Sequence, residues 1–115
     1  MAQAAAKEAP KETPGREVRV EISLDSHNRI VTKPEIFKVC KSKDQEVVWV
    51  FVGEQEHRFT VDFETNGSPF YEKQFGSDAP VSGLVRRDVL SGPKKYKYTV
   101  RLGSAVADPE GVVDP

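Results

Sequence analysis

The side chains best suited to hold a copper or zinc ion are two histidines, His27 and His57, and one cysteine, Cys40. They lie far apart in the sequence, without the close Cys–His spacings of a structural zinc site. His27 falls within "DSHN", a polar tetrapeptide that is typical of a turn. Metal binding by His57 therefore requires further ligands, such as carboxylates or groups from a partner. The alternative interpretation is a packed or hydrogen-bonded strand residue.

Cys40 is also the one thiol that could act as a nucleophile. A thiol becomes reactive when its surroundings favour the thiolate, and Lys38, Lys41 and Lys43 are close enough in sequence to lower its pKa. No CxxC motif accompanies it. A free cysteine at the end of a strand is the simpler interpretation.

Motifs for catalysis are missing from the sequence. It contains no GxSxG nucleophile elbow, no glycine-rich phosphate loop and no HExxH metal motif. Acidic and basic side chains alternate with apolar ones, so we expect them on outward strand faces rather than in a sheltered cleft. The sequence predicts a protein that is not an enzyme and that needs no cofactor.

Short apolar stretches with a period of two predict an all-β protein. In "VRVEISL" the residues Val18, Val20, Ile22 and Leu24 alternate with polar ones, and "EVVWVFV" is rich enough in β-branched and aromatic residues to suggest a central strand. The expected strands cover residues 18–24, 29–33, 35–40, 46–52, 57–63, 83–90, 96–102 and 111–113. These seven or eight strands, separated by turn signals, predict an antiparallel Greek-key β-sandwich.

The segment between Phe63 and Pro80, "FETNGSPFYEKQFGSDAP", is expected to be a long connection because it is rich in glycine and proline. It carries three aromatic residues, Phe70, Tyr71 and Phe75. Loops on a rigid sandwich often bind partners, and aromatic side chains supply contact area. We therefore predict these three as interaction residues, with the alternative that their rings fold back over one end of the core.

The overall composition limits the kinds of partner. Lysine and arginine total 17 against 18 acidic residues, so no net field attracts nucleic acid or anionic lipid. Residues 1–16 are rich in Ala, Lys, Glu and Pro and are expected to form a flexible tail before a single domain at 17–115. No apolar run is long enough to cross a membrane. The sequence as it stands suggests a soluble cytoplasmic protein, or a periplasmic or secreted one if a signal peptide has been removed.

Two stretches, "KSKDQEVVWVFVGEQEHRFTVDF" and "YKYTVRLGSAVADPEGVVDP", resemble the cupredoxin-like, or plastocyanin-like, domain over residues 18–114. Trp49 and His57 occupy the places of that family's strand tryptophan and first copper ligand. Tyr96 and Tyr98 look like the tyrosines of the strand that leads to its copper loop. The resemblance implies a sandwich of the cupredoxin type.

The resemblance also shows what is missing from a blue-copper site, which needs a thiolate and two imidazoles. Val100 stands where the family has its cysteine ligand, and Gly103 where it has its second histidine. The family-based expectation is therefore a domain without type 1 copper that acts as a binding or protein-interaction module, with another protein as partner. The alternatives are a divergent protein that handles copper or zinc through His57, and an accessory domain of a larger oxidase or membrane complex.

Overall fold

Ten β-strands and no helix make up the described residues of the computed structural model, namely 16–53, 57–63, 67–90, 92 and 94–115. The all-β class is therefore confirmed, and this part of the chain holds no helix that could cross a membrane. The predicted tail lies outside the described residues except for Arg16. The strands are β1 (Glu17–Leu24), β2 (Ile30–Lys33), β3 (Ile36–Cys40), β4 (Glu46–Phe51), β5 (Thr60–Asp62), β6 (Gln74–Gly76), β7 (Lys95–Lys97), β8 (Thr99–Leu102), β9 (Ala105–Ala107) and β10 (Glu110–Asp114).

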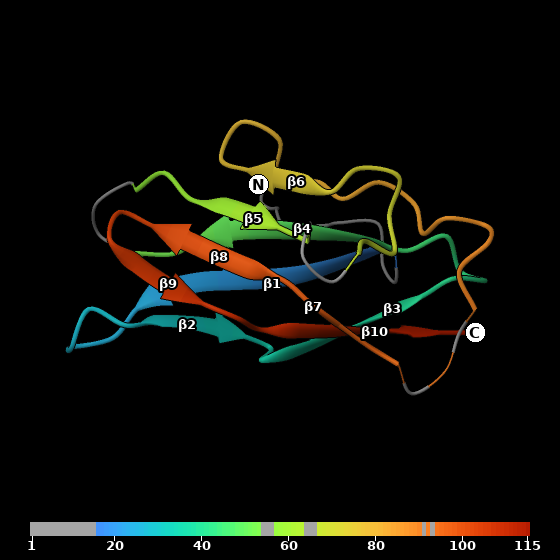
Figure 1. Ribbon diagram of the computed structural model, residues 1–115, viewed down its shortest axis with the longest axis horizontal. Coiled ribbons are helices and arrows are strands. Elements are labelled where there is room, and N and C mark those ends of the chain that lie inside the picture. Colours follow the sequence, from blue (N-terminus) through green and yellow to red (C-terminus); the bar gives the residue numbers. More distant parts are fainter. Residues whose placement is uncertain (1–15, 54–56, 64–66, 91, 93) are drawn as a thin grey trace, which may run out of the picture.

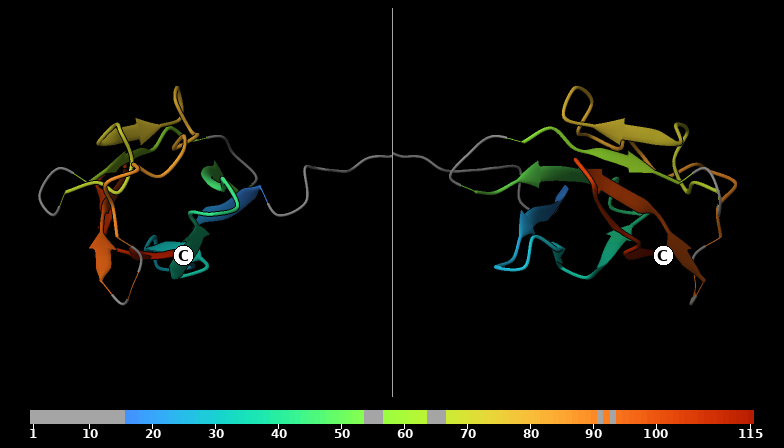
Figure 2. Two further views of the ribbon diagram at one scale, coloured as in Figure 1. Left: turned by 90° about the vertical axis from the view of Figure 1, so that its right-hand side faces the viewer. Right: turned by 60° about the vertical axis from the view of Figure 1, so that its left-hand side comes forward.

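The strands form three hydrogen-bonded sheets, in the orders β2-β1-β4, β3-β10-β7 and β6-β5-β8-β9 (Figure 1). Figure 2 shows the three sheets surrounding one interior, as in a β-sandwich. The β1–β4 and β3–β10 pairs are parallel, and the other pairs are antiparallel. Two of the sheets are therefore mixed, whereas β6-β5-β8-β9 is wholly antiparallel. Alternation along single strands does not predict this, since half-buried strands of either kind share the period of two.

The core is built from alternate residues of the predicted strands. Val20 and Ile22 of β1 are fully buried, and Val18 and Leu24 pack against the core from the two ends of the strand. The centre of the core is aromatic. Its fully or almost fully buried rings are Phe37, Trp49, Phe63, Phe70 and Tyr98.

β4 was expected to be a central strand, but it stands at the end of the order β2-β1-β4. Its outer edge is instead met by the connection around Val81. The Trp49 N–H donates to the carbonyl of Pro80 at 3.0 Å, and the Ser82 N–H donates to the carbonyl of Val47 at 2.8 Å. An irregular segment thus covers the edge of the most apolar strand, which protects it from pairing with other chains.

The strand expected at 83–90 is not formed. This segment makes an isolated bridge, Phe70 to Val85, and a turn in which the Val89 N–H donates to the carbonyl of Arg86 at 3.2 Å. Val85 and Val89 are buried, whereas Leu84 and Leu90 are exposed. A strand with a period of two would also bury Arg87, which lies midway between these two valines but is exposed.

Residues 96–102 were expected to form one strand, and their alternation is confirmed because Tyr96, Tyr98, Val100 and Leu102 are all buried. The structure divides this stretch at Tyr98. β7 before it pairs with β10, and β8 after it pairs with β5 and β9. The Tyr98 N–H donates to the carbonyl of Pro109 at 3.0 Å. The sequence "AVA" of β9 is too short to show a period and was missed.

Two buried polar groups meet in the aromatic core. Neither the hydroxyl of Tyr98 nor the Trp49 indole N–H makes a hydrogen bond of good geometry with another described residue. Burial raises the pKa of Tyr98 to about 12, although the nearby Trp49 indole N–H acts weakly in the opposite direction. A buried hydroxyl without a partner costs stability, so this site makes a testable prediction.

Tyr98→Phe is expected to leave stability at neutral pH unchanged or slightly higher, and to remove a loss of stability at alkaline pH. The unfolded chain releases the tyrosine proton near its ordinary pKa of about 10, before the folded chain does. In the wild-type protein, Tyr98 therefore leaves the free energy of unfolding unchanged below about pH 10. Above that pH it lowers the free energy of unfolding, by about 2–3 kcal/mol as the pH approaches 12. Urea unfolding at pH 8, 10 and 11.5 checks this, with Tyr71→Phe as the exposed control. Equal alkaline losses in wild type and Tyr98→Phe would contradict it.

Candidate interaction groove

His57, the predicted metal residue, lies at the surface ahead of β5 and not within that strand. Its side chain is exposed, and its ring packs edge-on against Phe51 with centroids 5.1 Å apart. The expectation of a strand over residues 57–63 was wrong at its beginning, because β5 begins only at Thr60. Among the described residues, no group of three or more histidine, cysteine, aspartate or glutamate side chains could hold a metal ion. Metal handling through His57 stays a prediction.

The two positions of the missing copper ligands have structural roles of their own. Val100 is fully buried and faces Val61 across the β5–β8 pair. Gly103 turns the chain between β8 and β9 with a φ of +62°. Glycine adopts this backbone conformation without the steric cost that a side chain brings.

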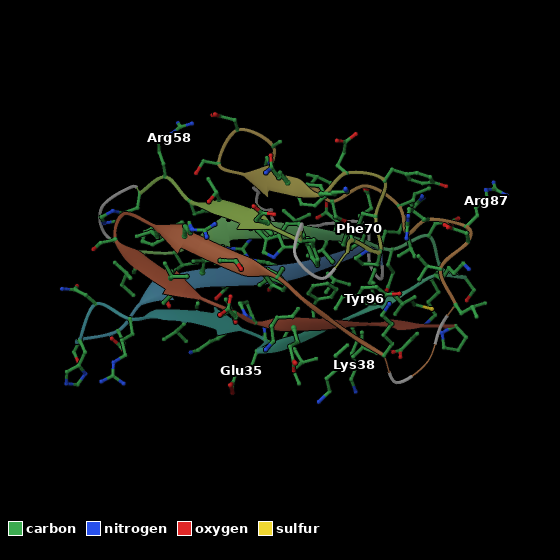
Figure 3. All side chains as sticks on the ribbon, in the orientation of Figure 1. Glu35, Lys38, Arg58, Phe70, Arg87 and Tyr96 are labelled. Atoms are coloured by element: carbon green, nitrogen blue, oxygen red, sulfur yellow. The ribbon has the colours of Figure 1, made fainter. Side chains whose placement is uncertain are left out.

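The three predicted interaction residues separate into two groups. Phe70 and Phe75 are 1% and 6% exposed and pack against Trp49, with ring centroids 6.4 and 5.2 Å away. The expectation that these two present a contact surface was wrong, because the core takes up their rings, and Figure 3 shows Phe70 among the interior side chains. Tyr71, in contrast, is 64% exposed.

A local hydrogen-bond network explains why neighbouring aromatic residues point in opposite directions. The hydroxyl of Ser68 accepts a hydrogen bond from the Phe70 N–H at 3.0 Å and donates to the carbonyl of Glu72 at 2.7 Å. Ser68 is itself buried, so this tight turn is fixed to the core. The turn directs Phe70 inward and leaves Tyr71 on the surface.

Tyr71 borders a groove of about 510 Å³ at the end of the molecule where β3 ends and the 84–90 segment passes. We call it the Tyr71 groove, and it is lined by Lys41, Asp44, Tyr71, Leu84, Val85 and Arg87. Leu84 is 46% exposed, and the buried Val85 also belongs to the lining. The volume lies within the range of about 300–1,000 Å³ that is common for binding sites.

Hydrogen bonds hold the walls of the Tyr71 groove together. The Lys41 ammonium donates to the carbonyls of Arg87 and Val89, which joins the turn after β3 to the 84–90 segment. The Arg87 N–H donates to the Tyr71 hydroxyl at 3.4 Å. This hydrogen bond restricts the exposed Tyr71 side chain at its hydroxyl end. A held aromatic ring loses little conformational entropy when a partner binds.

Cys40 lies beside this groove, and its thiol is near Pro115 and Ser42, with Sγ 2.8 Å from the Pro115 carbonyl oxygen. The hydrogen bond with the Ser42 hydroxyl lowers the pKa of Cys40 most. The backbone N–H groups of Lys43 and Ser42 and the Lys43 charge act in the same direction, against desolvation. Of the three lysines expected to act on the thiol, Lys43 does so, whereas Lys41 is turned toward backbone carbonyls.

The sequence did not indicate Leu84, Arg87 or Lys41 as members of one site. Leu84 was assigned to a strand, and Lys41 was considered for its effect on Cys40. The available signal was the irregular spacing of the apolar residues in 83–90. No known protein family matches the chain, and no curated protein matches its sequence.

Proposed function

We propose that this chain is a protein-interaction module, built on a cupredoxin-like sandwich, which binds its partner at the Tyr71 groove. The observation that carries the proposal is the pair of exposed apolar side chains, Tyr71 and Leu84, on walls that hydrogen bonds hold in place. Tyrosine, arginine and buried apolar floors are the elements from which binding hot spots are commonly made. The groove combines all three in Tyr71, Arg87 and Val85.

The cupredoxin-like assignment is supported by the order of Trp49, His57, Tyr96 and Tyr98, together with an all-β sandwich. A binding role agrees with the position of the groove. It lies on irregular connections held by a rigid core, where binding residues are frequently found.

A photo-crosslinking amino acid at position 84 tests the proposal in extracts of the source organism. Position 106 is the matched control, because Val106 is 55% exposed and lies on β9 at the other end of the molecule (Figure 1). We expect a defined protein to be crosslinked from position 84 and not from position 106. The purified pair should then bind, with about tenfold weaker affinity for Leu84→Asp and unchanged affinity for Val106→Asp.

Two results would contradict the proposal. One is the same set of proteins captured from both positions, which indicates random collision. The other is a purified partner whose affinity is the same for wild type and for Leu84→Asp.

A further inference from the structure

The charges around the Tyr71 groove indicate what kind of segment fits into it. We infer that the groove binds a peptide segment of a partner protein in which a carboxylate stands next to a large apolar side chain. This inference rests on the proposed function and adds the chemistry of the partner.

The positive charge comes from Arg87 and from the turn after β3. The Arg87 side chain is exposed and extends away from the body of the protein in Figure 3. In the "RRD" sequence Asp88 lies 3.6 Å from Arg86, and no carboxylate of the described residues lies within ion-pair distance of Arg87. Its guanidinium is therefore available for an external carboxylate, which it can bind through two parallel hydrogen bonds.

Lysine side chains add to this charge. Lys41 lines the groove, and its ammonium donates to the carbonyls of Arg87 and Val89. Lys43 lies in the same turn, without a carboxylate partner among the described residues. Asp44 is the acidic residue of the named lining. The chain-terminal Pro115 also lines the groove, so the lining has no net positive charge, and the cation open to a ligand is the Arg87 guanidinium, which is unpaired among the described residues.

The apolar part of the groove accounts for the second half of the inference. The Leu84 side chain and the Tyr71 ring are exposed, and the buried Val85 also contributes to the lining. An apolar side chain that enters here removes the exposed Leu84 surface from water. A carboxylate at its side can then reach the exposed Arg87 guanidinium, in an ion pair that salt weakens.

Titration of the ¹⁵N-labelled full chain with blocked peptides tests the inference by NMR. The probes are acetyl-Leu-Glu-Phe-Glu-amide and the same peptide with glutamine in place of both glutamates. We expect saturable shifts of the Tyr71, Leu84 and Arg87 amides, with affinity about fivefold higher for the glutamate peptide at low salt. Arg87→Gln should abolish that preference. Arg101→Gln, an exposed arginine on β8, should keep it.

The failures are distinguishable from one another. Equal affinities for the two peptides at the groove overturn the charge inference and leave the proposed function standing. If neither peptide shifts the amides at millimolar concentration, the inference about the peptide is overturned as well. The proposed function is then decided separately, by crosslinking from position 84. If the same amides shift on dilution of the protein alone, or on removal of residues 1–15, the occupant is a second copy or the chain's own N-terminal segment.

Discussion

Replacing Trp49 with alanine is expected to lower the free energy of unfolding by about 3–5 kcal/mol. Trp49 is 1% exposed and is the ring to which most of the aromatic core is joined. Its ring centroid lies 5.2–6.4 Å from those of Phe37, Phe63, Phe70, Phe75 and Tyr98. Since small domains commonly have about 5–15 kcal/mol of stability in total, the variant should be largely destabilised. Urea unfolding followed by far-ultraviolet circular dichroism measures the loss.

Tyr71→Ala is the matched control for this prediction. It also removes an aromatic ring, but one that is 64% exposed, so we expect a change within about 0.5 kcal/mol. The same variant should weaken binding of a partner at the Tyr71 groove. A loss of stability for Tyr71→Ala as large as for Trp49→Ala would show that the ring belongs to the core, and the groove would lose its main wall.

Gly111→Val is expected to destabilise the protein by about 3 kcal/mol or more. Gly111 lies in β10 between β3 and β7, and a Cβ atom at this position would overlap the ring of Phe37 on β3. The Phe37 ring is fully buried, with Trp49 and Tyr98 beside it at centroid distances of 6.2 and 5.7 Å. It therefore cannot move aside without disturbing the core. Thermal and urea unfolding of the variant check the prediction.

A second substitution tests whether overlap with the Phe37 ring causes the loss of stability in Gly111→Val. Phe37→Leu by itself should be destabilising, but in the Gly111→Val background it should cost much less, because the smaller side chain makes room for the valine. Such coupling between contacting residues is commonly 0.5–3 kcal/mol. Losses that simply add would mean that Gly111 is needed for a reason other than the Phe37 ring.

Regular alternation made much of the fold predictable. In β1 and in residues 96–102 every second residue is apolar, and the structure buries those residues. The pairing partners were not predictable, because a period of two reports which face is buried and not which strand lies alongside. The parallel β1–β4 and β3–β10 pairs and the division at Tyr98 are decided by contacts between distant parts of the chain.

The candidate site was less predictable than the fold, and Phe70, Tyr71 and Phe75 show why. The sequence places these three aromatic residues in a polar connection, and composition alone treats them as equivalent. The buried hydroxyl of Ser68 distinguishes Phe70 from Tyr71, and pairing of β6 with β5 takes Phe75 into the core. Arg87 joins Tyr71 through a tertiary hydrogen bond, and Leu84 lines the same groove, and neither relation leaves a local pattern in the sequence.

The division of residues 95–102 between two sheets has a consequence for how the protein moves. This continuous stretch pairs with β10 through β7, before Tyr98, and with β5 through β8, after it. Neither sheet can therefore open without straining the other. We expect their amides to exchange with solvent together, in one global unfolding event. The 84–90 segment lies outside the sheets, but the buried Val85 and Val89 and two hydrogen bonds from the Lys41 ammonium join it to them. The groove wall that this segment forms is therefore expected to keep its shape for as long as the sheets behind it stay closed.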